Sequence, residues 1–323
     1  MFEGTDVIAS QSQIKLTVTS KVRVSTDVVA LTLTHPDGRR LPDWTPGAHV
    51  DVVLPTGVNR QYSLCGDRWD PYNYRIAVHH ERTGRGGSAF IHEELTEGAM
   101  VELGGPRNNF HLAPSEEYLF IAGGIGITPL LPMIKQADML GAEWKLLYLG
   151  RSRGTMAFID ELAAYGDRVL VFPKDESGPC HLDELIGDHR KGTKAYVCGP
   201  QRLLAAVEQR CANWPMGSLR LEHFAAKAQG APALDTAFDV ELTAAGLSIT
   251  VPPNMSIVDA LQDAGINILT SCRQGTCGTC EVTVLKGEPD HRDSILGDAD
   301  RAAGHCMYPC VSRSCSNLLV LDL

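Results

Sequence analysis

A tight loop near the end of the sequence carries three cysteines. The stretch SCRQGTCGTC, residues 271–280, spaces Cys272, Cys277 and Cys280 as C-x4-C-x2-C and places glycines between them. Plant-type [2Fe–2S] sites use this spacing together with a distant fourth cysteine. Glycines let such a loop fold closely around a cluster, so that backbone N–H groups can bond its sulfurs. Three later cysteines could supply the fourth thiolate: Cys306, Cys310 and Cys315.

Cys310 is the predicted fourth ligand. It stands in MYPCVSR, before the last predicted strand, and 29 residues separate it from Cys280, which suits a long excursion that returns to the loop. A structural zinc site also takes four thiolates, but zinc sites usually pair two short C-x2–4-C knuckles, and the second knuckle is missing here. Six of the ten cysteines fall in the last 52 residues, which favours metal or redox chemistry over a disulfide framework.

Two glycine-bearing turns follow predicted strands in the middle of the sequence. GGIGITP, residues 123–129, stands between the strand EYLFIAGG and a stretch with helical spacing. Glycines there would let a phosphate approach backbone N–H groups at the positive end of a helix. The spacing departs from the G-x-G-x-x-G of Rossmann domains. VCGP, residues 197–200, ends another strand, so the two turns should meet at the carboxyl edge of one sheet, where nucleotides bind.

A second pair of motifs lies in the first third of the sequence. RQYSL, residues 60–64, reads as a strand, and RGGS, residues 85–88, as a turn. Arg60 and Ser88 could hold a phosphate, Gly86 and Gly87 could offer backbone donors, and Tyr62 could pack against a flat ring. A single Arg-Tyr pair on a strand is more often surface than site, so the interpretation depends on the other motifs.

The elements that must position these residues fall into three domains and a linker. Residues 10–113 show short runs in which Val, Thr and Ile alternate with polar residues, a pattern typical of an antiparallel β-barrel or β-sandwich. Residues 114–225 alternate buried strands with helical stretches, which predicts an α/β domain with a parallel sheet. Residues 226–236 lack large apolar side chains and read as a linker. Residues 237–323 combine a predicted hairpin, a capped helix and two further strands.

Composition excludes several classes of protein. The formal charge of −10 argues against nucleic-acid binding, which needs basic surface. No apolar run approaches the roughly 18 residues of a membrane-spanning helix, and the first residues lack the pattern of a signal peptide. We therefore expect a cytoplasmic protein that does not bind membranes, and we expect a monomer.

The order of these motifs resembles that of phthalate dioxygenase reductase and its relatives. These single-chain reductases join a flavin-binding barrel, a ferredoxin-reductase-like nucleotide domain and a C-terminal plant-type ferredoxin of the α+β, β-grasp type. The resemblance covers essentially residues 10–323. It rests on RQYSL, GRGGS, GPRNNF (105–110), AGGIGITP, CGPQ, CRQGTCGTC, GEPDHRD (287–293) and CVSR.

The resemblance implies cofactors and site residues. The flavin would be FMN, with Ser63 near its hydride-accepting nitrogen and Phe224, in LEHF, approaching the nicotinamide. Residues implied at FMN are Arg60, Tyr62, Ser63, Leu64, Gly86, Gly87 and Ser88. Residues implied at the nicotinamide nucleotide are Gly123, Gly124, Ile125, Thr128, Arg151, Ser152, Cys198, Gly199, Pro200 and Phe224.

Two positions depart from the family pattern. His79 and His80 stand where a Lys-Arg pair is common, which bears on the flavin phosphate. After the strand that ends in LYLG the chain reads Arg151, Ser152 and Arg153, with no acid for the ribose hydroxyls. The family favours NADH as the donor, with NADPH as the alternative.

The cofactor set implies a function. A nicotinamide gives two electrons as a hydride, a [2Fe–2S] cluster takes one, and flavin connects the two. The sequence shows no Rieske Cys-x-His pair and no facial-triad iron site, so we expect a separate terminal oxygenase. The resemblance favours a Rieske non-haem iron oxygenase acting on an aromatic acid. The alternatives are a haem-thiolate monooxygenase as acceptor, or a flavin reductase with a zinc-bearing interaction module.

The predicted docking face for the oxygenase lies on the ferredoxin domain. Residues 237–323 carry 11 Asp and Glu against five Lys and Arg, a net charge of −6. Opposite charge accelerates the encounter of transient partners. Glu288, Asp290 and Asp293, between Cys280 and Cys310, are the candidate docking carboxylates.

Overall fold

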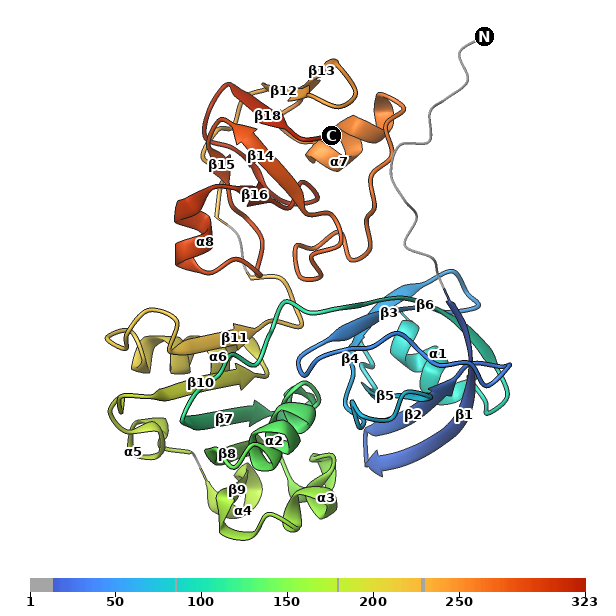
Figure 1. The fold of residues 1–323 in the computed structure, drawn as a ribbon, viewed down its shortest axis with the longest axis vertical. Helices are drawn as coiled ribbons and strands as arrows, with labels where there is room; N and C mark the ends of the chain where they lie inside the picture. Colours follow the sequence, from blue (N-terminus) through green and yellow to red (C-terminus); the bar gives the residue numbers. More distant parts are fainter. Residues whose placement is uncertain (1–13, 85, 179, 228–229) are drawn as a thin grey trace. The chain divides into compact units, whose positions relative to one another are not determined.

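The computed structural model describes residues 14–84, 86–178, 180–227 and 230–323. Its contacts divide the chain into two compact units, one from Ser12 to Phe224 and one that contains Ala225–Leu323. Figure 1 shows the strands and helices of each unit in sequence colours.

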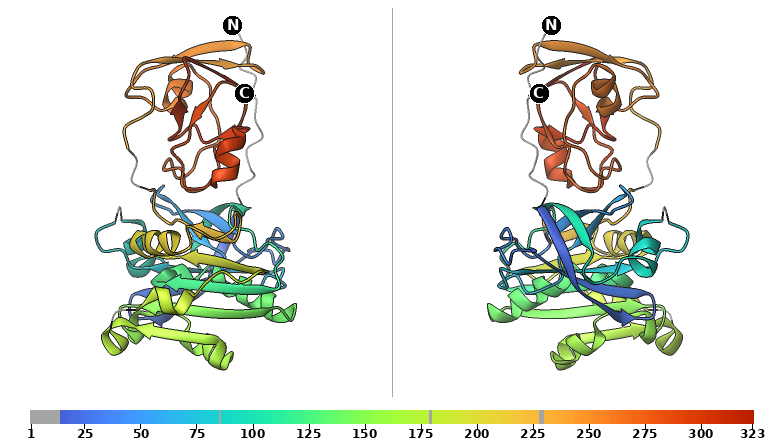
Figure 2. Two further views of the ribbon diagram at one scale, coloured as in Figure 1. Left: turned by 90° about the vertical axis from the view of Figure 1, so that its left-hand side faces the viewer. Right: turned by 90° about the vertical axis from the view of Figure 1, so that its right-hand side faces the viewer.

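The first part of the larger unit is a six-stranded antiparallel sheet. Its strands follow the order β4-β3-β6-β1-β2-β5, and the long β1 pairs with both β2 and β6. Figure 2 shows this part of the chain in blue and cyan from two further sides. Alternate residues such as Leu16 and Val18 are fully buried, as the sequence pattern predicted. The elements are β1 (Ile14–Ser25), β2 (Val28–Thr34), β3 (His49–Val53), β4 (Asn59–Ser63), β5 (Asn73–His79), α1 (Gly87–Glu93) and β6 (Met100–Arg107).

The second part of this unit is a five-stranded parallel sheet with the order β11-β10-β7-β8-β9. The chain leaves β7 toward β8 and β9, and returns on the other side of β7 to form β10 and β11. The order therefore reverses between β7 and β10, and ligands of such sheets bind at this point. The strands are β7 (Glu117–Gly123), β8 (Glu143–Gly150), β9 (Val169–Pro173), β10 (Thr193–Cys198) and β11 (Leu219–Glu222).

Short helices connect these parallel strands. Buried Met133 and Ile134 of α2 pack in the same core as Phe120, Tyr148 and Tyr196 of the strands. The helical elements are η1 (Gly124–Ile127), α2 (Leu130–Met139), η2 (Arg153–Thr155), α3 (Ile159–Ala163), η3 (Gly166–Arg168), α4 (Lys174–Ser177), α5 (Leu182–Ile186) and α6 (Gln201–Arg210).

The smaller unit is a mixed sheet that packs against one helix. The predicted hairpin is formed by β12 and β13, and β12 also pairs in parallel with the last strand, β18. The predicted capped helix is α7, whose N-cap Ser256 accepts the Asp259 N–H at 3.1 Å. The elements are β12 (Phe238–Leu242), β13 (Leu247–Val251), α7 (Ile257–Asp263), β14 (Val282–Lys286), β15 (Pro289–Asp290), α8 (Asp298–Ala303), β16 (Cys306–Met307), β17 (Arg313–Ser314) and β18 (Leu318–Leu321).

The architecture confirms the predicted fold class: an antiparallel barrel sheet, a parallel α/β sheet and an α+β ferredoxin-like unit. The described part of the chain contains no helix with the length and apolar character needed to cross a membrane.

Candidate functional site

The four predicted cluster ligands lie in two thiol pairs. The Cys272 thiol contacts that of Cys277, and the Cys280 thiol contacts that of Cys310. Three of the four are buried, and Cys280 and Cys310 pack with Tyr308 and Val258. Within the described residues, no three His, Cys, Asp or Glu side chains converge on the position of a single metal ion. Two pairs are the arrangement that a two-iron cluster needs, because each iron takes two of the four thiolates.

Backbone N–H groups of the loop point at the first pair. Those of Gln274 and Thr276 donate to Cys272 Sγ at 3.3 Å and 3.5 Å, and that of Thr279 donates to Cys277 Sγ at 3.4 Å. The contact between these two thiols lowers the pKa of Cys272, aided by Thr276 and Gln274, and raises the pKa of Cys277. Each thiol pair therefore favours one thiolate, at Cys272 and at Cys310, and the thiolate is the form that binds metal. These donors and thiols fit a [2Fe–2S] cluster.

The long excursion returns to the loop beside Gly275. A Cβ on Gly275 would lie 2.5 Å from Val311 Cγ2, and its φ of +67° is one that glycine adopts readily. The Ser294 N–H also donates to the Gly275 carbonyl at 2.8 Å. The other two candidate cysteines lie elsewhere. Cys306, on β16, pairs with Thr283 of β14, and Cys315 is exposed.

The two glycine turns of the parallel sheet touch, as predicted. A Cβ on Gly199 would lie 2.9 Å from Gly123 Cα, and a Cβ on Gly126 would lie 2.2 Å from the Cys198 carbonyl oxygen. Cys198 pairs with Ala122 across β10 and β7, so both turns leave the carboxyl ends of adjacent strands. Only glycine lets the two backbones approach this closely, at the position where the strand order reverses.

Other residues predicted to bind the nucleotide have different environments. Thr128 is buried, and its hydroxyl donates to the Ile125 carbonyl at 3.0 Å, so its side chain stabilises the turn. Pro200 is the residue before α6. Gly124 is in a left-handed conformation with φ of +55°. Phe224 is 44% exposed, just after the last strand of the sheet.

Sequence reasoning missed Glu222, at the end of β11. Its carboxyl contacts the buried Cys198 thiol, and its Oε2 atom is shielded from solvent. Burial raises the pKa of Glu222 to about 8 and that of Cys198 well above its usual range. This carboxyl can hold a proton at neutral pH, beside the turn where a nicotinamide would lie. The signal in the sequence was the acid in LEHF, two residues before Phe224.

The arginines after β8 differ in their contacts. The Arg153 guanidinium donates to both carboxylate oxygens of Glu176, at 3.3 Å and 3.1 Å. Arg151 is exposed, and its carbonyl accepts the Asp175 N–H at 3.2 Å. Ser152 caps η2 through Thr155. The acid that pairs with Arg153 thus comes from α4, the segment after β9.

The predicted flavin motifs meet where β4 contacts α1. A Cβ on Gly87 would lie 3.0 Å from both Cγ and Nε of Arg60. Ser88 Oγ accepts the Glu81 N–H at 3.0 Å, which closes the loop before α1. Ser63 is buried, and burial raises the pKa of the Tyr62 hydroxyl. The site therefore offers a guanidinium, a hydroxyl and an unobstructed glycine backbone, the groups that fit a flavin phosphate.

One predicted flavin contact, Leu64, needs correction, and the two histidines that depart from the family pattern have other surroundings. The Leu64 side chain is fully buried in the barrel core, so only its backbone can face a flavin. His80 stacks on His92 of α1 with ring centroids 4.6 Å apart, and its Nε2 lies 3.5 Å from Glu93. His79 is exposed.

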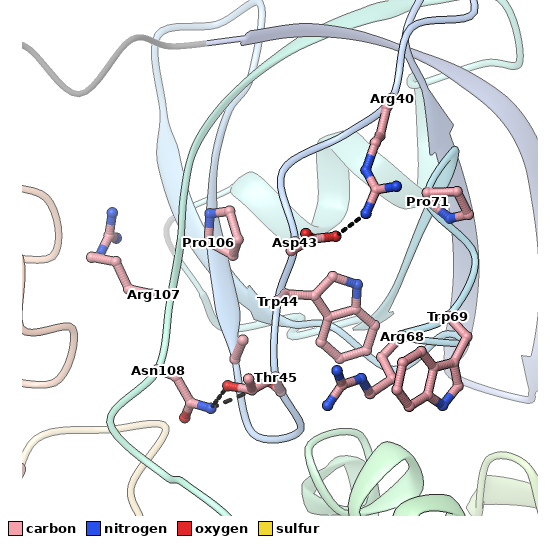
Figure 3. Close-up of a pocket in the computed structure, with 11 residues that line it drawn as sticks. Arg40, Asp43, Trp44, Thr45, Arg68, Trp69, Pro71, Pro106, Arg107 and Asn108 are labelled. Atoms are coloured by element: carbon pink, nitrogen blue, oxygen red, sulfur yellow. Dashed lines mark hydrogen bonds and ion pairs between the residues drawn. The ribbon is translucent and has the colours of Figure 1, made fainter.

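A pocket of about 530 Å³ lies at one end of the barrel (Figure 3). Two pairs of its polar groups bond each other: Arg40 pairs with Asp43 at 2.6 Å, and the Asn108 amide donates to Thr45 Oγ1 at 2.8 Å. Asn108 belongs to the GPRNNF motif, which thus shapes this end of the barrel. None of the predicted FMN residues is among its lining residues, which are Arg40, Asp43, Trp44, Thr45, Ala48, Arg68, Trp69, Pro71, Pro106, Arg107 and Asn108.

The proposed docking carboxylates are not equivalent. The Asp293 side chain is fully buried, and its Oδ1 accepts the N–H groups of Ile295 and Leu296 at 2.9 Å and 2.7 Å. Its expected role in docking is therefore wrong, because a buried carboxylate cannot contact a partner. Asp290 is largely buried and pairs with Arg292, whereas Glu288 is exposed.

Comparisons with known proteins agree with these sites. Residues 240–315 match the family model for the 2Fe-2S iron-sulfur cluster binding domain. The chain is 41% identical over 317 residues to the phenoxybenzoate dioxygenase subunit beta of Ectopseudomonas oleovorans, covering 98% of this chain and 99% of the relative.

Two solved structures share the fold. An intact type IV self-sufficient cytochrome P-450 monooxygenase superposes with a TM-score of 0.91 at 42% identity, over 96% of this chain. This chain spans only 41% of the length of that monooxygenase. Phthalate dioxygenase reductase, described as a modular structure for electron transfer from pyridine nucleotides to [2Fe–2S], superposes with a TM-score of 0.70 at 36% identity, covering 96% of this chain and 98% of that one.

The comparisons confirm the predicted [2Fe–2S] cluster and the assignment to an electron-transferring oxidoreductase. With matches of this identity over nearly the whole length of both chains, the chain belongs to the phthalate dioxygenase reductase family.

Proposed function

We propose that this chain is the reductase component of a multicomponent oxygenase and passes electrons from NADH, through FMN and a [2Fe–2S] cluster, to a separate terminal oxygenase. One observation carries the proposal: the same chain brings two glycine turns together at the nucleotide edge of a parallel sheet, and four thiols together in two pairs. Neither a simple flavin reductase nor an isolated ferredoxin needs both.

The residues of the chain have separate tasks in this proposal. When bound, FMN supplies the exchange between a two-electron donor and one-electron acceptors. Arg60, Gly87 and Ser88 hold its phosphate, and Ser63 faces its ring. Cys272, Cys277, Cys280 and Cys310 hold the cluster.

The nucleotide site uses the sheet edge. Gly123, Gly124 and Gly199 let the pyrophosphate approach the backbone, and Phe224 covers the nicotinamide position. The Cys198–Glu222 pair keeps a proton beside this position at neutral pH, since the pKa of Glu222 is about 8.

The contacts at the ribose position support NADH over NADPH. Glu176 occupies the Arg153 guanidinium with two bonds, so Arg153 is not free to bind a 2′-phosphate. The Glu176 carboxylate also repels a phosphate at the same place. A carboxylate beside the ribose is the usual mark of NAD binding.

We propose a Rieske non-haem iron oxygenase acting on an aromatic acid as the terminal acceptor. The names of phthalate dioxygenase reductase and phenoxybenzoate dioxygenase support an aromatic acid substrate. A haem-thiolate monooxygenase is the second candidate acceptor, because a self-sufficient cytochrome P-450 monooxygenase contains a closely similar portion. The docking face, the monomeric state and a cytoplasmic location stay predictions.

A direct test uses the purified holoprotein. NADH should bleach the flavin band and then the broader iron–sulfur bands, and the protein should reduce both ferricyanide and cytochrome c. A Cys272→Ser variant without cluster should still reduce ferricyanide with NADH but should lose cytochrome c and oxygenase reduction. Oxygenase turnover at the wild-type rate in that variant would show that the cluster is not on the route.

A further inference from the structure

A buried guanidinium lies in the strand that follows the last cluster ligand. Arg313 of β17 is 7% exposed and donates to three backbone carbonyls, those of Met255 at 2.6 Å, Pro252 at 3.2 Å and Thr236 at 3.4 Å. It also lies 5.0 Å from the ring centre of Phe238. Among the residues that the structure describes, no carboxylate oxygen comes within 4.0 Å of it. Buried arginines are usually paired, so this one calls for an explanation.

The carboxylate that faces Arg313 across the ladder is already paired with another arginine. Asp290 of β15 lies opposite Arg313 in the two-stranded ladder, but its Oδ2 pairs with Arg292 at 3.4 Å and accepts the Ala233 N–H at 3.0 Å. Burial and Arg292 lower the pKa of Arg313, while Asp290 opposes them. A guanidinium nevertheless stays protonated in a protein. The three side chains together therefore carry a net positive charge, mostly out of solvent.

This positive group is connected to the second thiol pair through the chain and through α7. Arg313 stands three residues after Cys310, so the Cα atoms of the two residues are at most about 11 Å apart. Its strongest acceptor, Met255, directly precedes the N-cap of α7, and Val258 of that helix packs against Cys280 and Cys310. The guanidinium thus ties the strand after Cys310 to the start of the helix that packs against these two cysteines. Charges in such a partly buried region are screened far less than charges on the surface.

We propose that Arg313 is a positioning residue that raises the reduction potential of the cluster. A [2Fe–2S] cluster with four thiolates is negatively charged and gains another negative charge on reduction, so a buried cation stabilises its reduced form. Charge and burial near a cluster are known controls of its potential. The surrounding domain is acidic, with a net charge of −6 over residues 237–323, and would otherwise disfavour reduction. The inference rests on the proposed cluster ligands.

The test measures the midpoint potential of the cluster in purified full-length protein by dye-mediated redox titration, followed by absorbance and by the electron paramagnetic resonance of the reduced cluster. Arg313→Gln should move the potential to a more negative value, and Arg313→Lys should restore most of the shift because it keeps the charge. Lys286→Gln, which removes an exposed charge from β14 of the same unit, is the matched control and should leave the potential unchanged.

A second variant, for which the expected shift in potential has the opposite sign, keeps the test decisive if Arg313→Gln does not retain iron. Asp290→Asn removes the negative member of the group and should move the potential to a more positive value. An unchanged potential in Arg313→Gln with full iron content, or a negative shift in Asp290→Asn, would overturn the inference. Absence of a cluster from the wild-type protein would instead overturn the proposed function, so the two failures are distinguishable.

Discussion

At the scale of single residues, the identity of the fourth cluster ligand is the sharpest question. Only Cys310 of the three downstream cysteines lies beside the Cys280 thiol. We expect Cys310→Ser to lose the cluster, while Cys306→Ser and Cys315→Ser keep it. Iron content and visible absorbance of the three purified variants measure this. Full iron content in Cys310→Ser, together with loss of iron in either other variant, would show that a different cysteine is the fourth ligand.

Glu222 gives a prediction about pH. Its folded pKa of about 8 lies above the roughly 4.3 of a carboxyl in an unfolded chain. As pH rises between these values, the unfolded chain ionises first, so the folded state is progressively destabilised. Glu222→Gln should therefore unfold at a higher temperature than wild type at pH 9, and the difference should shrink at pH 5.

The control for this prediction is Glu184→Gln, at an exposed carboxylate on α5. Its melting temperature should follow wild type at both pH values. Glu222→Gln should also remove any inflection near pH 8 from the rate at which NADH reduces the flavin. A stability difference that is equal at pH 5 and pH 9 would show that the carboxyl is not buried in the way described.

Glu176 gives a prediction about the donor nucleotide. Glu176→Gln should free Arg153 and remove the repulsion of a 2′-phosphate, so the NADPH/NADH ratio of kcat/KM should rise on the order of tenfold, about 1.4 kcal/mol. Binding of 2′,5′-ADP, measured by calorimetry, should strengthen in parallel. Glu143→Gln, an exposed carboxylate at the opposite edge of the sheet, is the control. An unchanged ratio would assign the preference to other residues.

The difference between Cys272 and Glu222 shows what sequence could and could not predict at this scale. The three loop cysteines lie within nine residues, so their spacing in the sequence is enough to predict that they lie close together in space. The Cys198–Glu222 contact depends instead on β10 and β11 being neighbours, which pairs Cys198 with Glu222 across the sheet. No local pattern encodes that adjacency, because the order of strands is a property of the folded sheet.

At the scale of elements, the flavin motifs depend on how closely α1 approaches β4. A Cβ on Gly87 would press on Arg60 at 3.0 Å. Alanine is otherwise favourable in a helix, by up to about 1 kcal/mol over glycine. We expect Gly87→Ala to fold normally but to weaken FMN binding about tenfold, because Arg60 must move. Fluorescence of released flavin measures the change.

The matched control is Gly154→Ala, where the added Cβ meets nothing closer than 3.6 Å. It should retain FMN like wild type. Equal FMN affinity in Gly87→Ala and Gly154→Ala would mean that Arg60 does not hold the phosphate through this contact.

The elements themselves were largely predictable from the sequence, because each sheet has its own periodicity. Strands β7 and β8 read as strongly apolar runs since both faces are covered, and β1 alternates because one face is exposed. Helix α1 was not predicted, because two of its seven residues are buried and a short helix has little periodicity. The burial of Asp293 was missed for a similar reason: its partners are backbone N–H groups two and three residues later, which give no signal in side-chain type.

At the scale of the whole molecule, charge is distributed unevenly. Residues 237–323 carry −6 of the total formal charge of −10 in about a quarter of the length. The simplest explanation of this negative charge is that it keeps the protein soluble, because acidic surfaces are common on soluble domains. If the charge instead serves docking of the oxygenase, only carboxylates that are exposed to solvent can take part. Glu288 remains exposed, Asp290 is engaged by Arg292, and Asp293 is buried.

If Glu288 and other exposed carboxylates of this unit steer it onto a basic patch of the oxygenase, the rate of electron delivery must depend on the salt concentration. We expect the rate of oxygenase reduction to fall as the screening length drops below about 8 Å, because long-range attraction is then lost. Glu288→Lys should slow delivery at low salt and reduce the dependence on salt. NADH-to-ferricyanide activity should not change, because that small acceptor needs no docking face. Asp293→Asn is not a suitable probe, since its effects would report on folding of the buried loop. Rates that are flat across the salt range and indifferent to Glu288→Lys would leave solubility as the role of the acidic surface.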